Sequence, residues 1–279
     1  MRGMLTIAHL TWLEARRRRI VLAAVLCGAL FLLVYGTALF FSQRSPGVSA
    51  GVINLAQRRV QQELLLLAGL YVGNFLTLAL AVMLPVDALS GEIDSGIMQT
   101  LASKPIARAE IVLGKWLTYW LLTAAYLVFM AGGIVLLVRW LLGSEPQHVV
   151  VALALMLLGA TVLLSLSTAG GTRLTTITNG LVAFAFYGIA FIGGWIEQIG
   201  AIVGNPTARY VGTAISLVSP VDAMWRRAAH EIQSPLMRDV QITPFSGVSV
   251  PSDAMIYWTI GFVVITLGIG LHWFRRRAL

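Results

Sequence analysis

Charged residues are scarce in this 279-residue chain: Asp, Glu, Lys and Arg make up 11% of it, whereas hydrophobic residues make up 58%. Soluble domains carry roughly 25% charged residues. A water-soluble core of this size could not bury so much apolar surface, so the excess has to face lipid. The mean hydropathy of +0.82 points the same way. The composition excludes an ordinary soluble domain and predicts an integral membrane protein.

Cysteine and metal-ligand patterns are also lacking. The one cysteine, Cys27, lies in an apolar run, which excludes an intrachain disulfide and a cysteine-based zinc site. We interpret it as a small hydrophobic packing residue. The four histidines are scattered and form no His-Glu-x-x-His pattern. The sequence therefore predicts no metal site.

A phosphate-binding loop of the form Gly-x-x-x-x-Gly-Lys-[Ser/Thr] is missing, so the chain has no nucleotide site of that kind. We expect neither catalytic residues nor a cofactor in this chain. The net charge of +8 does not indicate a nucleic-acid partner, because the basic residues form short clusters beside apolar runs. A nucleic-acid interface would need a continuous basic face.

What the chain has in abundance is long apolar runs. Six of them exceed twenty residues without Asp, Glu, Lys or Arg, and about 20 apolar residues cross the hydrocarbon core as a helix. Backbone groups in lipid must bond within their own segment, which favours helices. The sequence predicts one all-α integral membrane domain over 1–279, with transmembrane helices at 20–42, 64–89, 114–138, 149–171, 174–196 and 254–274.

Lys and Arg residues set the expected orientation. With both termini in the cytoplasm, the inner segments carry twelve of these residues and the outer segments carry eight. The bias is strongest at 16–19 and 275–277, which directly abut apolar runs. An even number of spans also places both termini on one side. We expect a multi-pass protein of a bacterial or archaeal inner membrane with both termini cytoplasmic.

Residues 1–19 are expected to form a helix that lies in the membrane interface before the first span. A cleaved signal peptide is the alternative, but the following apolar run of 23 residues is longer than the roughly 7–15 residues of a signal peptide. One stripe of this helix collects Met1, Met4, Leu5, Ala8, Trp12 and Ala15.

The segment 197–253, before the last span, is long and mixed. Residues 199–203 and 210–218 are apolar but too short to span, and Pro206 and Pro220 interrupt the segment. Such pieces fit short re-entrant or interfacial helices on the extracytoplasmic side, if the protein shelters their broken backbone. An ordinary extracytoplasmic loop is the alternative.

The loop 90–113, between the second and third spans, is the most informative stretch. Residues 95–103 can form a short helix with apolar i,i+4 pairs, and Lys104-Pro105 would end it. On the expected topology this helix is cytoplasmic and suited to dock a soluble partner, whereas a plain connecting loop is the alternative. The amine of Lys115 is expected to reach the membrane interface.

The same stretch resembles the signature of ABC-2-type permeases, in which a Glu-x-x-x-Gly segment precedes Leu-x-x-x-Pro-x-x-Arg-x-Glu-Ile-x-x-Gly-Lys. The matching residues are Glu92, Gly96, Leu101, Pro105, Arg108, Glu110, Ile111, Gly114 and Lys115. The N-terminal helix, the six spans and the long outer segment extend the resemblance over essentially the whole chain. Residues 219–226 are similar to the permease branch linked to copper-enzyme maturation (NosY-like).

The resemblance implies an exporter with two permease copies or two homologous permeases, and with two cytoplasmic ATPase subunits that bind ATP and magnesium. It implies that the loop helix and its flanks dock on the ATPase, with the role falling on Glu92, Ser95, Ile97, Met98, Leu101, Ala102, Lys104 and Arg108. The second and fifth spans would line the path and 206–234 would close it outside. Membrane lipid and an extracytoplasmic accessory protein complete the expected partners.

The expected function is therefore that of an exporter permease, which moves a substrate outward by alternating access. A membrane anchor that recruits a soluble complex without transport would use the same docking helix. An ion-coupled secondary transporter is disfavoured, because such proteins keep ionisable residues at membrane depth and these spans have none.

Overall fold

The computed structural model describes residues 2–15, 18–44, 55–94, 107–144, 146–235, 237 and 249–277. None of these residues lies in a strand, which confirms the predicted all-α class for this part of the chain. The helices are α1 (Arg2–Ala15), α2 (Arg19–Gln43), α4 (Leu55–Val86), α5 (Ser90–Asp94), α7 (Arg108–Leu142), α8 (Val149–Gly170), α9 (Thr176–Val203), α10 (Pro206–Val218), α11 (Val221–Ile232) and α13 (Asp253–Arg276).

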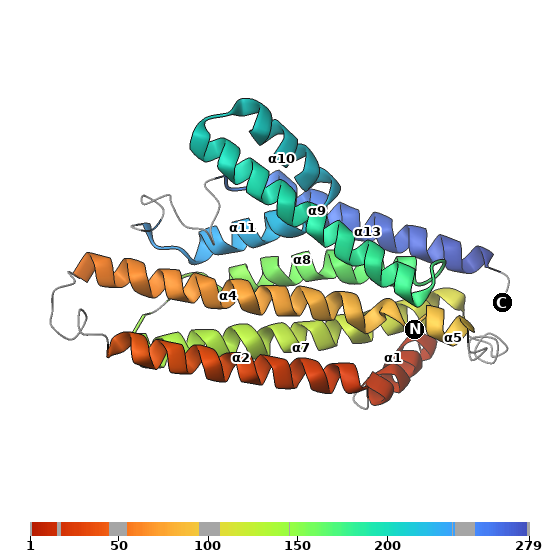
Figure 1. Cartoon of the computed structure of the whole chain (residues 1–279). Helices are drawn as coiled ribbons and strands as arrows, with labels where there is room; N and C mark the ends of the chain where they lie inside the picture. The colour runs from red at the N-terminus through yellow and green to blue at the C-terminus, as the bar shows by residue number, and fades with distance from the viewer. Residues whose placement is uncertain are drawn as a thin grey trace.

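Six of the described helices are long and apolar enough to cross a membrane, as the sequence predicts: α2, α4, α7, α8, α9 and α13. Most of them run along one common axis, and α9 tilts away from it (Figure 1). Both chain termini lie at the same end of this bundle, which we call the near end, and we call the opposite end the far end (Figure 1).

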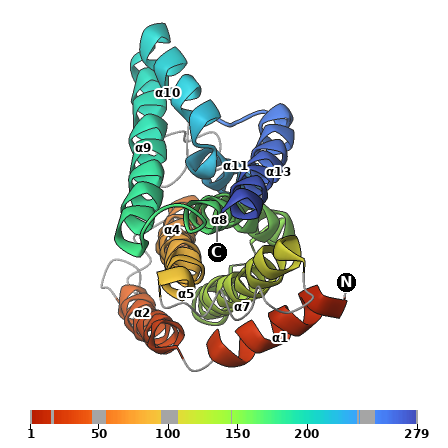
Figure 2. The ribbon, with the colours of Figure 1, turned by 90° about the vertical axis from the view of Figure 1, so that its right-hand side faces the viewer.

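The centre of the bundle is α8, which contacts α4, α7, α9, α11 and α13. Figure 2 shows these neighbours gathered around it, with α2 at the periphery. In the most apolar 18 residues of each helix, 56% of α8 is buried but only 6% of α2. The outer side of α2 is therefore left to lipid or to another chain.

Polar side chains inside the spans bond to neighbouring helices. The indole Nε1 of Trp116 donates to Ser165 Oγ at 3.0 Å, and that of Trp120 donates to Thr161 Oγ1 at 3.0 Å. Ser167 Oγ donates to the carbonyl oxygen of Val82 at 3.0 Å. These bonds tie α7 and α4 to α8, so the hydroxyls hold helices together within the apolar bundle.

α1 lies across α7 at the near end (Figure 2). Its buried side chains are Ile7, Thr11 and Ala15, whereas Leu5 is exposed. The packed face is therefore rotated from the predicted stripe. Gly114 of α7 lies against this helix: a Cβ atom there would lie 2.8 Å from the carbonyl oxygen of Met4, so glycine allows the close approach.

Two helices, α4 and α7, are longer than the spans predicted for them. Both continue beyond the apolar runs into segments where polar groups form hydrogen bonds. α4 begins at Leu55 rather than 64, and α7 covers Arg108–Leu142 rather than 114–138. At the far end, Gln62 Nε2 of α4 donates to the carbonyl oxygen of Leu142 at 2.9 Å. The bond joins the two extensions to each other.

α9 also passes its expected end at 196 and continues to Val203. α10 then packs along α9, and α11 packs mainly on α8. Asn205 begins α10, because its Oδ1 accepts hydrogen bonds from Thr207 N at 3.0 Å and Ala208 N at 3.2 Å. The segment 206–232 thus forms short helices, and their place relative to the membrane stays a prediction.

Gly270 provides a test of the contact between α13 and α8. A Cβ atom there would lie 2.9 Å from the Cα and Cβ of Ala169. We expect Gly270→Val to push α13 off α8 and to cost about 1–3 kcal/mol of stability. Gly268→Val is the matched control, because a Cβ atom at that position meets nothing within 4 Å. Thermal unfolding in detergent measures both variants, and equal midpoints would contradict the packing.

Candidate functional site

At the near end, polar side chains join α4, α5, α7, α8, α9 and α13. We call this set the collar: Asp87, Ser90, Glu92, Arg108, Lys115, Thr172, Thr176, Asn179 and Arg277. The segment 95–106 lies outside the described residues, and its two flanks, α5 and the start of α7, belong to the collar. The collar is therefore the base from which that loop extends.

The central contact of the collar is a buried ion pair between Lys115 of α7 and Glu92 of α5. Lys115 Nζ also donates to the carbonyl oxygen of Ala88 at 2.9 Å. Only 4% of the lysine side chain is exposed. A carboxylate and a carbonyl oxygen hold the amine inside the bundle, and its place relative to the membrane interface stays a prediction. The pair locks α5 to α7.

Arg108, in the first turn of α7, holds the end of α13. Its Nη1 donates to the carbonyl oxygen of Arg277 at 2.6 Å and lies 3.3 Å from that of Arg275. Carbonyl groups at a helix C-terminus lack partners within the helix, and a cation there is favourable. Arg277 in turn donates to the carbonyl oxygen of Thr172, between α8 and α9. Arg108 thus links α7 to α13 and onward to α8.

The first turn of α9 completes the collar. The hydroxyls of Thr176 and Ser90 lie 2.8 Å apart, and Thr176 Oγ1 donates to Asp87 Oδ1 at 3.2 Å. Asn179 is buried, and its Nδ2 donates to the carbonyl oxygens of Ser167 at 2.8 Å and Val86 at 3.4 Å. α9 is thereby tied to α4, α5 and α8.

Two of the eight predicted docking residues, Glu92 and Arg108, are described, and both lie in the collar. The structure does not bring them together: Glu92 pairs with Lys115, while Arg108 bonds to the end of α13. The other six, Ser95, Ile97, Met98, Leu101, Ala102 and Lys104, lie outside the described residues. The docking role of the set stays a prediction.

Residues 47–51 read Gly-Val-Ser-Ala-Gly, the Gly-x-Ser-x-Gly pattern of some hydrolases, which sequence reasoning wrongly took to be missing. In those enzymes the serine sits on a turn between a strand and a helix. Here the pattern lies outside the described residues, and the preceding described element is helix α2, which ends at Gln43.

At the far end, a second polar cluster is centred on Arg226 of α11. Its Nη2 lies 2.9 Å from Glu197 Oε2 of α9, and its Nε lies 3.0 Å from Asp222 Oδ2. Nη2 also bonds Ser216 of α10, and Nη1 donates to the carbonyl oxygen of Ser249 at 3.1 Å. One guanidinium, 1% exposed, therefore joins α9, α10, α11 and the segment before α13. Sequence reasoning missed this cluster, because it placed Glu197 in an outer loop.

The position of Asp222 in this cluster changes its pKa. Burial raises its pKa to about 6; Arg226 opposes the shift and the nearby carboxylate of Glu197 adds to it. Two carboxylates thus face one guanidinium in the cluster. The protonated form of Asp222 is therefore easier to reach than that of an ordinary aspartate.

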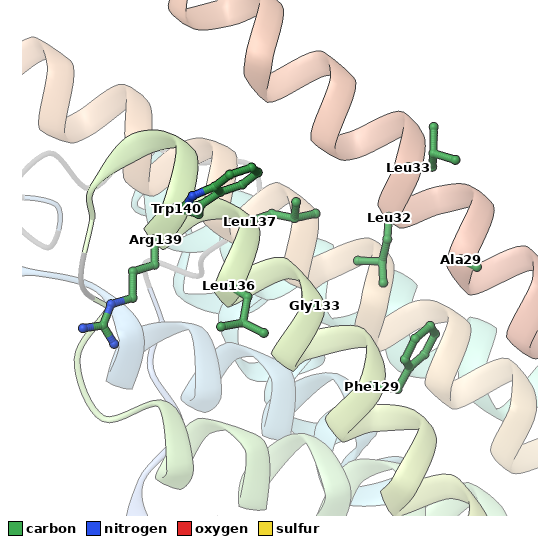
Figure 3. Close-up of a pocket in the computed structure, with 9 residues that line it drawn as sticks. All are labelled: Ala29, Leu32, Leu33, Phe129, Gly133, Leu136, Leu137, Arg139 and Trp140. Atoms are coloured by element: carbon green, nitrogen blue, oxygen red, sulfur yellow. The ribbon is translucent and has the colours of Figure 1, made fainter.

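An open apolar groove of about 980 Å³ runs between α2 and α7 (Figure 3). Leu32 and Leu33 of α2 form one side and Leu137 lies on the other, and Leu32 packs against Gly133, where a Cβ atom would lie 2.7 Å from Leu32 Cδ1. Arg139 lies at one end and its guanidinium points away from α2 (Figure 3). The groove suits hydrocarbon rather than a polar ligand.

The described residues contain no group of three or more His, Cys, Asp or Glu side chains that could hold a metal ion. Comparison with protein families shows that residues 5–279 match the family described as ABC-2 family transporter protein. Comparison with curated proteins gives no match.

The ion pair in the collar can be tested by a double substitution. Glu92→Gln leaves the buried charge of Lys115 without its counter-ion, and we expect it to cost about 3–5 kcal/mol of stability. Lys115→Met in the same chain removes that charge and should recover most of the loss. Glu14→Gln is the control, because the Glu14–Arg18 pair is exposed and should contribute below about 1 kcal/mol. Unfolding midpoints that fall equally for Glu92→Gln and Glu14→Gln would refute the role of the pair.

Asp222 predicts a pH dependence of stability. Its pKa is higher in the folded chain, about 6, than the ordinary 3.8, so the folded state binds the proton more tightly. Stability from this group is present below the ordinary pKa and is lost as pH rises through about 6. We expect the unfolding midpoint of the wild type to rise between pH 7.5 and 5. In Asp222→Asn that rise should shrink, and an unchanged pH profile would count against the shift.

Proposed function

The chain belongs to the ABC-2 transporter family, as a multi-pass membrane permease, and from this premise we propose that it is the membrane subunit of an exporter driven by a separate cytoplasmic ATPase. Permeases of this family normally work with such an ATPase and often dimerise. The observation that carries the proposal is the collar. It ties the two flanks of the loop 95–106, α5 and the start of α7, to the spans α4, α8, α9 and α13. The family match assigns no cargo, so the similarity of 219–226 to the copper-linked branch stays a prediction.

The collar supports transmission of force from the loop to the spans. A load on a loop helix reaches α5 and α7 together, because Glu92 and Lys115 join them. From α5 it reaches α9 through the Ser90–Thr176 contact, and from α7 it reaches α13 through Arg108. A partner that pushes on the loop would thus move several spans as one unit.

The chain's own composition supports an external energy source. The sequence has no Gly-x-x-x-x-Gly-Lys-[Ser/Thr] loop, and its apolar runs carry no charge that could couple to an ion gradient. In this proposal ATP and magnesium bind to the partner ATPase at the near end. The near end, where Arg18, Arg19 and the arginines at 275–277 lie, is then cytoplasmic, and cargo moves outward.

The exposed sides of α2 and α9 support pairing with a second permease. Leu22, Leu30 and Leu33 of α2 are exposed, as are Ile177 and Leu181 of α9. In the proposed complex, a second copy or a homologous permease packs on part of this surface, and lipid covers the rest.

Coupling to the ATPase can be tested by Leu101→Asp, which places a charge on the predicted apolar ridge of the loop helix. We expect this variant to lose co-purification with an ATPase encoded beside it and to lose stimulation of ATP hydrolysis. Val203→Asp is the control: it adds the same charge at an exposed apolar residue of the far end and should keep both properties. Equal behaviour of the two variants would refute docking through the loop.

A membrane anchor would also bind a partner through the loop, so movement must be measured separately. Cys27 can be replaced by alanine, and spin labels can then be placed on the exposed residues Val203 and Tyr257. A transporter changes the distance between the labels when the ATPase traps ATP. A distance that stays constant in the intact complex would support the anchor and contradict the exporter.

A further inference from the structure

A cavity of about 300 Å³ lies in the far half of the bundle and is lined by residues of α9, α10, α11, the segment before α13 and the first turns of α13. Apolar side chains form most of its wall, chiefly Leu217, Ala223, Met255 and Trp258. Its polar lining contains Glu197, Ser216 and Arg226, which bond to one another, together with Thr213 and Ser252. The lining is therefore that of a site for an amphiphile, with a place for a polar head and a place for hydrocarbon.

The charged part of this lining belongs to a cluster with one excess negative charge. The carboxylates of Glu197 and Asp222 both contact the single guanidinium of Arg226, and all three side chains are at most 12% exposed. Arg226 and Glu197 are the charged groups that act on Asp222 among the described residues. A buried charge without compensation is costly, so a cation beside Glu197 would be favourable.

An anionic head group would bind less favourably in this cavity than a cationic one. The guanidinium of Arg226 already bonds Asp222, Glu197, Ser216 and the carbonyl oxygen of Ser249. Its donors are therefore largely used within the cluster. A carboxylate or sulfate in the cavity would also face Glu197 and be repelled by it.

The size of the cavity limits the apolar part of the ligand. Its volume is at the lower end of the roughly 300–1,000 Å³ of small-molecule sites. Such a space accommodates one alkyl chain or small ring system rather than both acyl chains of a phospholipid. Trp258 is held in the wall by a hydrogen bond from its Nε1 to the carbonyl oxygen of Leu217, 2.9 Å long. Its ring lines the cavity and can contact the alkyl chain of the ligand.

We propose that this cavity binds a single-chain amphiphile with an ammonium head, with the head beside Glu197 and the chain against Met255 and Trp258. The site follows from the cavity and the charge cluster alone. It therefore does not depend on whether the chain exports anything.

The test uses the full chain in phosphatidylcholine nanodiscs and dodecylammonium as the probe. We expect dodecylammonium to raise the unfolding midpoint saturably, and dodecyl sulfate at the same concentrations to leave it unchanged. Glu197→Gln removes the excess charge and should weaken apparent binding about tenfold or more. Ala254→Trp fills the cavity from an exposed position of its wall and should abolish the shift.

Glu231→Gln is the matched control, because this carboxylate also lies at the far end but pairs with Arg227 outside the cavity. It should keep the affinity of the wild type. Equal stabilisation by dodecyl sulfate, or wild-type binding by Ala254→Trp, would overturn the proposal. Stabilisation by phosphatidylethanolamine nanodiscs without any effect of dodecylammonium would assign the cavity to a two-chain lipid and would overturn it as well.

Discussion

The amine of Lys115 sits where α7 enters the apolar bundle, and a charge at that depth needs a counter-ion within reach. The counter-ion comes from α5, which exists as a separate short helix because α4 ends at Val86, just after Pro85, and the chain turns through 87–89. The turn brings both the carbonyl oxygen of Ala88 and the carboxylate of Glu92 to the amine. The same turn places Ser90 against α9. The ion pair of one lysine thus holds α5 against α7, next to the first turn of α9. It thereby positions the two flanks of the loop 95–106.

The helices are held together by different polar groups at the two ends of the bundle. Lipid is as apolar as leucine, so apolar burial does little to hold membrane helices together, and close contacts and interhelical hydrogen bonds take its place. At the near end, side chains mostly bond to backbone carbonyl oxygens, as Arg108 does at the end of α13. At the far end, charged side chains bond mainly to one another around Arg226. Between the ends, glycines such as Gly270 let helices approach closely.

Much of the fold could be predicted from the sequence, because a charge-free run longer than the hydrocarbon core has few alternatives to a spanning helix. The bounds were harder to predict: α9 continues past 196, and Glu197 there contacts Arg226, which lies 29 residues further along the chain. The partner of Lys115 was not predicted for the same reason. Glu92 lies 23 residues upstream, and a single sequence does not reveal such pairs. The resemblance singled out Glu92, Arg108 and Lys115 in the collar. At the far end the similarity of 219–226 covers Asp222 and Arg226, but it did not indicate their contact with Glu197. For the loop residues 95–104, docking stays a prediction.

α9 connects the two polar clusters. Its first turn belongs to the collar through Thr176 and Asn179, and its far half carries Glu197. With 28 residues it is about 42 Å long, and a helix of that length does not stretch. Much of its middle is exposed, so few neighbours resist a change of tilt. A displacement of Ser90 or Asp87 can therefore be passed along α9 to Glu197. In the proposed exporter, this makes α9 the element through which movement at the loop would reach the far end, and the Arg226 cluster the contact that must yield there.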